Sequence, residues 1–258
     1  MSDVSREDLE RCKLVVGKAF ESQGISISDE QLEVITKDIM GISFSHGGGY
    51  SSDIILGFTK GYIDHGLYGS NMTEEIFDTV DENGQPTGET VTRSQAHAEG
   101  IRHRTAHIWV VRENGDKTEV LLQKRALNKD SFPGRYDTSS AGHIQAGDEP
   151  LESAVRELSE ELGIQANPDD LHFVGTFPIQ YEKEFHGKPF KDNEIAFVYV
   201  YDKDVDVEKL IIQKEELDSV EWFDLEEVYQ VCQPPRDEKF CVPMGGLEIV
   251  RNYIKREE

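Results

Sequence analysis

The stretch that decides the fold is residues 141–164, AGHIQAGDEPLESAVRELSEELGI. Its second half predicts an amphipathic helix, because its apolar residues recur at steps of three and four and so share one face. Asp148 or Glu149 can cap the start of this helix, and Pro150 suits its first turn. Gly163 suits the position just after its end. The residues of the apolar stripe are Leu151, Ala154, Val155, Leu158 and Leu162.

A second face of the predicted helix is acidic, since Glu157, Glu160 and Glu161 lie three and four positions apart. Two like unit charges about 4 Å apart repel by roughly 4 kcal/mol at an effective dielectric constant of about 20. Three carboxylates held together are therefore unfavourable unless a cation lies among them. Oxygen ligands without a thiolate suit Mg²⁺ or Mn²⁺. The alternative is a solvated acidic face, which is common in a chain this acidic.

The composition disfavours some classes of function. The chain has 258 residues, enough for one large or two modest domains, and a formal net charge of −24. An acidic surface repels nucleic-acid phosphate, which disfavours binding to a duplex. It also repels an anionic substrate, so a phosphate ester would need a local metal ion or a few lysines at the site.

The sequence also bears on location. Its three cysteines, Cys12, Cys232 and Cys241, form no C-x2-C pair, which favours a reducing compartment and disfavours a structural zinc site. The first residues are acidic and polar, unlike a signal peptide, and no apolar run approaches the roughly 18–20 residues of a membrane-spanning helix. We therefore expect a cytoplasmic protein without a membrane partner.

We expect two regions along the chain. Residues 1–74 predict a small helical N-terminal region of unknown role, with a first helix starting near Ser5 and Asp8. From residue 75 onward, strands and hairpin signals such as Asn114-Gly115 alternate with helices, which predicts an α/β fold with a mixed sheet. The expected strands are 76–80, 107–111, 120–124, 173–177, 196–201 and 220–223, and the later helices are 225–231 and 246–255.

The spacing within the opening stretch resembles the Nudix box, G-x5-E-x7-R-E-U-x-E-E-x-G-U, where U is aliphatic. Every fixed position of that pattern has its counterpart between Gly142 and Ile164, except that Asp148 stands where the pattern has glutamate. The resemblance implies the Nudix α/β/α sandwich for residues 75–258. It also implies a reaction on a diphosphate that depends on Mg²⁺ or Mn²⁺.

The resemblance further implies roles for the box residues. Glu157, Glu160 and Glu161 would be catalytic metal ligands, one of which also engages the attacking water. Arg156 would brace the loop before the helix by pairing with a carboxylate, and Asp148 would support that brace, although its short side chain leaves the geometry open. The structural residues of the box are Gly142, Asp148, Arg156 and Gly163.

Other segments resemble the isopentenyl-diphosphate isomerase-like branch of the superfamily. The isomerases use a cysteine just before the Gly-His of the box, and this chain has Ala141 there. Without that thiol, isomerisation by the usual route is disfavoured. Hydrolysis needs a divalent ion, a base and positive side chains, and is favoured. The segments that carry the resemblance are 103–107, 132–134, 137–143, 192–194 and 213–216.

The same branch suggests residues outside the box. Glu194 matches a carboxylate that faces the metal cavity, as a general base or an extra ligand; the alternative is an exposed acid at a strand start. His107 and His143 match positions that bind a separate metal in the isomerases, but Gly100 stands near the place of a further histidine. Ordinary core or hydrogen-bonding histidines are the alternative. The basic residues that would contact phosphate, or simply face solvent, are Lys124, Arg125 and Arg135.

We therefore expect a divalent-metal-dependent hydrolase that cleaves the pyrophosphate linkage of a nucleoside diphosphate derivative or another organic diphosphate. The alternatives are an isopentenyl-diphosphate isomerase-like enzyme and a ligand-sensing Nudix module without turnover. The expected partner is the small diphosphate substrate. A homodimer is expected from the resemblance alone, since Nudix relatives are often dimers.

Overall fold

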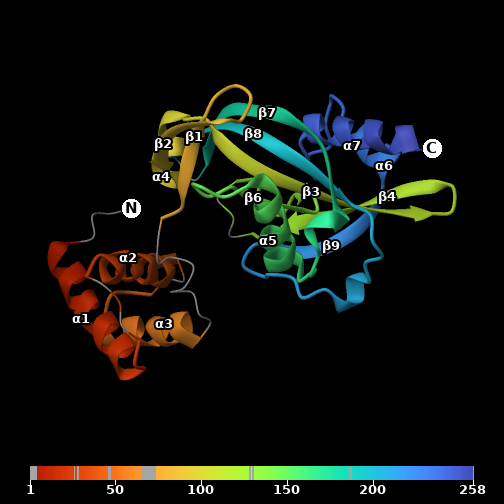
Figure 1. The fold of residues 1–258 in the computed structure, drawn as a ribbon. Helices are drawn as coiled ribbons and strands as arrows, with labels where there is room; N and C mark the ends of the chain where they lie inside the picture. The colour runs from red at the N-terminus through yellow and green to blue at the C-terminus, as the bar shows by residue number, and fades with distance from the viewer. Residues whose placement is uncertain are drawn as a thin grey trace. The chain divides into compact units, whose positions relative to one another are not determined.

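The computed structural model describes residues 5–25, 27, 29–45, 48–64, 74–127, 129, 131–185 and 188–257. The chain divides into two compact units, Met1–Glu74 and Glu75–Glu258 (Figure 1). In the part of the chain that is described, none of the helices has the length and apolar character needed to cross a membrane.

The first unit contains the helices α1 (Arg6–Ser22), α2 (Asp29–Ser45) and α3 (Ser52–Asp64). Ser5 caps α1, because its side-chain oxygen accepts a hydrogen bond from the backbone N–H of Asp8 at 3.1 Å. The apolar faces of the helices meet in one core, so the unit has its own packed interior. The buried residues of this core are Cys12, Val16, Phe20, Ile35, Ile39, Met40, Ile55 and Tyr62.

The second unit is built around a mixed β-sheet. Its strands are β3 (His103–Asn114), β4 (Lys117–Arg125), β5 (Tyr136–Asp137), β6 (Ser140–His143), β7 (Leu171–Phe185), β8 (Lys188–Tyr201) and β9 (Leu217–Asp224). They run in the order β5-β4-β3-β8-β7, with β6 also paired to β3 and β9 to β4. The pairing of β3 with β8 is parallel and the other pairings are antiparallel.

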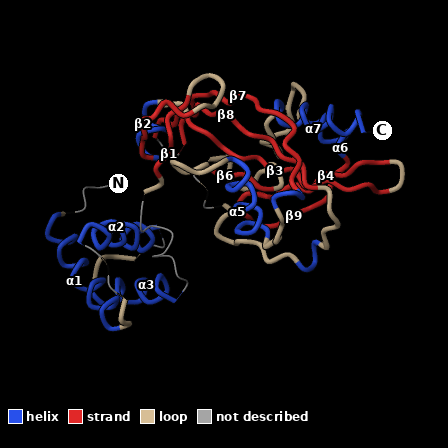
Figure 2. Tube along the Cα trace, viewed as in Figure 1, coloured by secondary structure: helices blue, strands red, loops and turns tan. Residues whose placement is uncertain are grey.

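Helices cover both faces of this sheet, because successive side chains of a strand point to opposite faces. On β3, for example, Ile108 belongs to one hydrophobic core and Trp109 to the other. The helix α5 (Pro150–Leu162) packs on the first core, and α6 (Leu225–Val231) and α7 (Met244–Glu257) pack on the second (Figure 2). This α/β/α arrangement confirms the fold class that the sequence predicts.

A smaller group of elements precedes the main sheet. β1 (Ile76–Val80) and β2 (Pro86–Thr92) form an antiparallel two-stranded hairpin, and α4 (Arg93–Glu99) follows it directly. β1 contacts β3, and α4 contacts β8 (Figure 1). The sequence analysis does not anticipate α4, a short helix that Thr92 caps and that ends at Gly100 in the left-handed conformation, with φ of 75°.

The β7–β8 hairpin is longer than the sequence predicts. Its outer half has a mixed charged and aromatic pattern, which gives little strand signal, but the backbone ladder continues without interruption from Ile179 opposite Glu194 to Phe185 opposite Lys188. The extension places Glu194 within β8, beside the start of β3. Short 3₁₀ turns lie at Pro168–Asp170 and Val207–Lys209.

Candidate active site and metal centre

The helix α5 has the ends that the sequence predicts. Pro150 lies in its first turn after Glu149, and Gly163 follows its last residue in the left-handed conformation, with φ of 71°. Neither of the two carboxylates considered as caps, those of Asp148 and Glu149, acts as a capping side chain. Glu149 makes no side-chain cap hydrogen bond, and the carboxylate of Asp148 instead pairs with Arg156.

The three glutamates of the box do not share one environment. Glu161 is 6% exposed and Glu157 is largely buried, and both face β6. Glu160 is exposed to solvent. Within the described ranges, these three side chains do not form a group whose ligand atoms all lie within 4.8 Å of one another. The acidic face therefore divides into two inward carboxylates and one outward carboxylate.

The two inward carboxylates pack closely against β6. The Oε2 atom of Glu161 accepts a hydrogen bond from the backbone N–H of Ala141 at 3.2 Å. The carboxylate of Glu157 occupies the space that a Cβ atom at Gly142 would need. Gly142 is thus required for close approach, whereas Gly147 serves the turn of the loop, with φ of 85° and open space around it.

Burial raises the pKa of Glu157 to about 7 and the pKa of Glu161 to about 8. For Glu161, the negative charge of Glu157 raises the pKa further. For Glu157, the neighbouring guanidinium of Arg156 acts in the opposite direction without overcoming burial. Two buried carboxyl groups that keep their protons to a higher pH than usual form an all-oxygen pair that suits a hard divalent cation, whose binding would release those protons.

Arg156 braces this arrangement. Its Nη1 atom donates to Oδ2 of Asp148 at 2.8 Å, so the shorter aspartate does reach the arginine. Its Nη2 atom donates to the main-chain carbonyl of His143 at 3.3 Å and to Oε1 of Glu157 at 3.2 Å. The guanidinium therefore ties the loop before α5, the end of β6 and one of the inward carboxylates together.

A second group of potential ligands lies around the first residue of β3 and the middle of β8. One residue from each of α4, β3, β6 and β8 places a ligand atom within 4.8 Å of the others, namely His97, His103, His143 and Glu194. We call these residues the histidine cluster. Strand register explains how they meet, because His103 lies opposite Glu194 in the parallel pair and Thr105 lies opposite His143 in the antiparallel pair.

The distances in the histidine cluster suit a bound ion. The Nε2 atoms of His103 and His143 lie 3.6 Å and 3.5 Å from Oε1 of Glu194, too far for good hydrogen bonds. Both nitrogen atoms are buried, and neither has a hydrogen-bond partner among the described residues. The Nδ1 atoms of His97 and His103 lie 3.0 Å and 2.9 Å from main-chain carbonyl oxygens. Such contacts orient the ring of a metal-ligating histidine.

The protonation of the histidine cluster also suits a metal. Burial, followed by the charges of His143 and His103, lowers the pKa of His97 to about 4, so its ring is neutral at neutral pH. Although burial raises the pKa of Glu194, the nearby rings of His103 and His143 outweigh it and hold this pKa well below its usual value. Imidazole nitrogen with one carboxylate suits Zn²⁺, Mn²⁺ or Fe²⁺ better than Mg²⁺. The residues present therefore fit a transition-metal ion.

Phe77 of β1 orders the histidine cluster from one side. Its ring stacks on His103 with a centroid distance of 4.9 Å and on His143 with a centroid distance of 4.6 Å, at an interplanar angle of 14° in both cases. Phe77 is fully buried, so the hairpin that precedes the main sheet fixes the orientation of two potential ligands.

The sequence suggests His107 as the partner of His143 in a metal site and gives no such role to His97 or His103. His107 lies two residues beyond Thr105 on β3. The centroid of its ring is 5.7 Å from that of Phe177, and His107 is outside the histidine cluster. His97 takes the part that the sequence analysis left vacant near Gly100. The sequence signal that points to His103 is the alternation of residues 103, 105 and 107, which puts their side chains on one face of a strand.

The basic residues expected around the pocket already have partners. Lys124 pairs with the exposed Asp218 at 3.4 Å. Arg125 donates to the main-chain carbonyl of Ser131 at 3.0 Å and supports the loop between β4 and β5. The guanidinium of Arg135 lies over an aromatic ring of the same loop, with 5.7 Å between its central carbon and the ring centroid.

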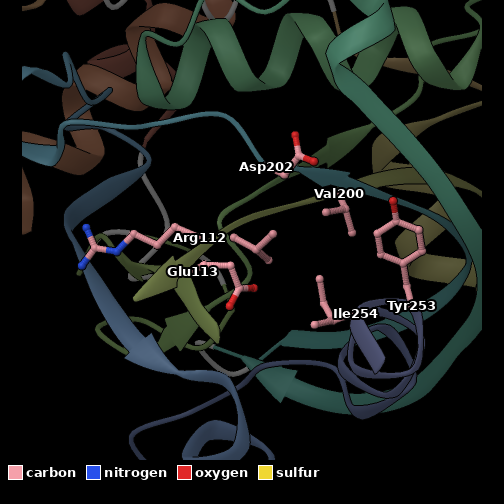
Figure 3. Close-up of a pocket in the computed structure, with 7 residues that line it drawn as sticks. Arg112, Glu113, Val200, Asp202, Tyr253 and Ile254 are labelled. Carbon is pink, nitrogen blue, oxygen red and sulfur yellow. The ribbon is translucent and has the colours of Figure 1, made fainter. Parts of the chain in front are cut away.

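A separate pocket lies at the other end of the same strands. Figure 3 shows Glu113 and Asp202 in it, near Tyr253 of α7. It is lined by residues near the ends of β3 and β8, whereas His103 begins β3 and Glu194 lies opposite it in the middle of β8. The rise of about 3.3 Å per residue puts roughly 20–30 Å between the two places, so this pocket is not part of the candidate site.

Comparison with known proteins bears on the second unit. The family model of the NUDIX domain matches residues 101–241. An uncharacterized Nudix hydrolase of Clostridium acetobutylicum is 40% identical over 146 residues, which are 57% of this chain and 68% of that protein. Nudix hydrolase 3 of Arabidopsis thaliana is 40% identical over 158 residues, which are 60% of this chain but 20% of that protein.

One solved structure shows the same fold. The crystal structure of DR0079 from Deinococcus radiodurans superposes with a TM-score of 0.51 and 18% sequence identity, covering 69% of this chain and 99% of that chain. The elements β1, β2 and α4, which supply Phe77 and His97, precede residue 101, where the family match begins.

Proposed function

This chain belongs to the Nudix family and is a pyrophosphohydrolase, and from that premise we propose a divalent-metal-dependent reaction on an organic diphosphate. The substrate we propose is a nucleoside diphosphate derivative or a related small diphosphate. One water molecule is consumed and one P–O bond of the anhydride is broken, so that each product carries a terminal phosphate.

The observation that carries this proposal is the pair of buried carboxylates, Glu157 and Glu161, behind Gly142. Buried like charges are unfavourable without a counter-charge, and the only ligands this pair offers are oxygens. We assign both residues to holding Mg²⁺ or Mn²⁺, with Glu160 at the solvent side of the same helix. A divalent ion bound there would neutralise phosphate charge and make a water molecule more acidic.

We assign Glu194 to the histidine cluster as a ligand rather than as the general base. Its Oε1 atom faces two imidazole nitrogen atoms, and its Oε2 atom accepts a hydrogen bond from Thr105 at 3.1 Å. Orientation of the attacking water therefore falls to a box glutamate. The histidine cluster would hold a separate transition-metal ion beside the diphosphate.

The isomerase-like alternative has one supporting observation, which is the histidine cluster itself, because the resemblance associates such a metal site with the isomerases. Ala141 weighs against it, because an isomerase acid–base pair would need a thiol there. We infer a hydrolase that carries an isomerase-like metal cluster. Proton exchange into isopentenyl diphosphate, measured by NMR, would instead support isomerisation.

The acidic composition and the free cysteines, Cys12, Cys232 and Cys241, also support our proposal of a cytoplasmic protein. The homodimer expected from the resemblance stays a proposal, and light scattering on the purified chain tests it. A sensing module without turnover would give tight ligand binding and no product.

The test of the proposed function is phosphate or nucleotide release from a panel of nucleoside diphosphate sugars, dinucleotides, coenzyme diphosphates and prenyl diphosphates, with Mg²⁺ or Mn²⁺. We expect Glu157→Gln to lower kcat about 100-fold or more, because a ligand of the catalytic ion is lost. The control is Glu119→Gln, which alters a carboxylate that accepts from Arg112 at 2.7 Å on β4. Wild-type turnover by Glu157→Gln would contradict the assignment.

A further inference from the structure

We propose that Asp78 and Arg104 are positioning residues, which hold the main chain of Gly147 and Asp148 so that the short side chain of Asp148 reaches Arg156. Asp78 lies outside the residues that match the family model, on β1. The inference rests on the proposed function, because it concerns how a box glutamate is aimed at its metal ion.

The two residues grip the loop through consecutive backbone groups. The Oδ2 atom of Asp78 accepts from Nη2 of Arg104 at 2.9 Å and from the backbone N–H of Gly147 at 3.0 Å. The same Nη2 atom donates to the main-chain carbonyl of Asp148 at 3.1 Å. The side chains are 14% and 6% exposed, so these charge-assisted hydrogen bonds are shielded from water.

From the loop, the contacts continue to a catalytic carboxylate. Asp148 accepts from Arg156 at 2.8 Å, and Arg156 donates to Glu157 at 3.2 Å. A displacement of the backbone at Asp148 therefore moves Arg156, and through it Glu157. Asp78 touches none of the inward carboxylates and acts through these contacts.

The aspartate at position 148 explains why Asp78 and Arg104 need to hold the main chain of the loop. A glutamate at position 148 would carry its carboxylate farther by one carbon–carbon bond, about 1.5 Å. With the shorter Asp148, the main chain itself must be held where the side chain can reach. A Cβ atom at Gly147 would meet nothing within 4 Å, so side-chain packing at this position does not hold the loop.

The test compares Asp78→Asn with Asp224→Asn, each in the wild-type chain and in the Asp148→Glu background. Asp224 is a matched control, since it is 15% exposed, pairs with Lys117 at 2.7 Å and accepts the N–H of Glu227 at 2.9 Å. It lies beside the start of β4, away from the box. The measurements are Mg²⁺ binding by calorimetry or NMR, the thermal midpoint, and kcat and KM on a substrate from the panel.

We chose Mg²⁺ because it prefers the oxygen ligands of the box to imidazole nitrogen. We expect Asp78→Asn to weaken Mg²⁺ binding and to lower kcat by about 10- to 100-fold, with KM changed less than about threefold. Asp224→Asn should stay within about twofold of wild type in both respects. Asp148→Glu should recover most of the loss, because the longer side chain reaches Arg156 without the grip.

Equal losses in the two asparagine variants, or no recovery with Asp148→Glu, would overturn the proposal. Mg²⁺ binding and thermal stability are measured without turnover. If the wild-type chain hydrolyses nothing on the panel, the proposed function fails while these measurements still decide the role of Asp78.

Discussion

The two ligand groups of this enzyme are built in opposite ways. Glu157 and Glu161 come from neighbouring turns of α5, so one contiguous stretch of sequence sets their geometry. The histidine cluster takes one residue from each of α4, β3, β6 and β8 and forms only when the sheet pairs in its final register. The first group offers oxygen and the second mainly nitrogen. Under the proposal above, the two groups would select different metals, and they depend on the fold to different degrees.

The largest effect should come from Gly142→Ala, which disturbs the pair of Glu157 and Glu161 and leaves the histidine cluster in place. The added Cβ atom would overlap the carboxylate of Glu157 and force it away. A displacement of about 1 Å at a catalytic group can reduce turnover by about 100-fold, and we expect at least that loss in kcat/KM. Zn²⁺ binding by the histidine cluster should persist, as measured by competition with a chelator. A Gly142→Ala enzyme with wild-type activity would break the comparison.

A smaller effect should follow from His103→Ala, which removes one residue of the histidine cluster. Loss of one ligand and of its contact with Glu194 should weaken Zn²⁺ or Mn²⁺ binding by about 10- to 100-fold. The measurement is bound metal per chain after dialysis, together with the dissociation constant. The matched control is His107→Gln on the same face of β3, which should change that constant by less than about twofold. A larger change in the control would extend the histidine cluster to His107.

The smallest effect concerns the stability of the metal-free protein against pH. The pKa of Glu161 is about 8 in the folded chain, against about 4.3 in an unfolded one. Between these values the folded state keeps a proton that the unfolded state has released, so the free energy of unfolding falls as pH rises. From pH 5.5 to pH 8 we expect a loss of about 3 kcal/mol from this group.

Urea unfolding in the presence of a chelator measures this loss, and Glu161→Gln is the comparison because its side chain does not titrate. The wild-type chain should lose more stability than the variant over that range, and Mg²⁺ should reduce the difference. If both proteins showed the same pH dependence, the burial of Glu161 would not govern its ionisation.

The sequence predicts the two groups unequally well, for a physical reason. Helical periodicity and end signals act over a few residues, so α5, its stop at Gly163 and the identity of the box could be read directly. His103 and His107 have the same alternation on β3, so the sequence alone does not show which of them lies in a group with His143. The choice depends on the register of β3 against β8, which places Glu194 beside His103.

Burial also separates residues that look equivalent in the sequence. Glu160 and Glu161 are adjacent in the chain, yet one is exposed and the other lies against the backbone of Ala141. The packing of α5 on the sheet decides between them, and periodicity gives only their relative angle. The same holds for Lys124, whose partner Asp218 comes from a strand far along the chain.

The hairpin of β1 and β2 and the helix α4 determine how far this enzyme can be truncated before residues of the candidate site are lost. A fragment trimmed to the limits of the family match, residues 101–241, would keep every letter of the box and still lack Phe77, Asp78 and His97. Such a fragment would be expected to lose one transition-metal ligand and the ring that stacks on two others. A truncation meant to isolate the catalytic unit should therefore begin no later than residue 75.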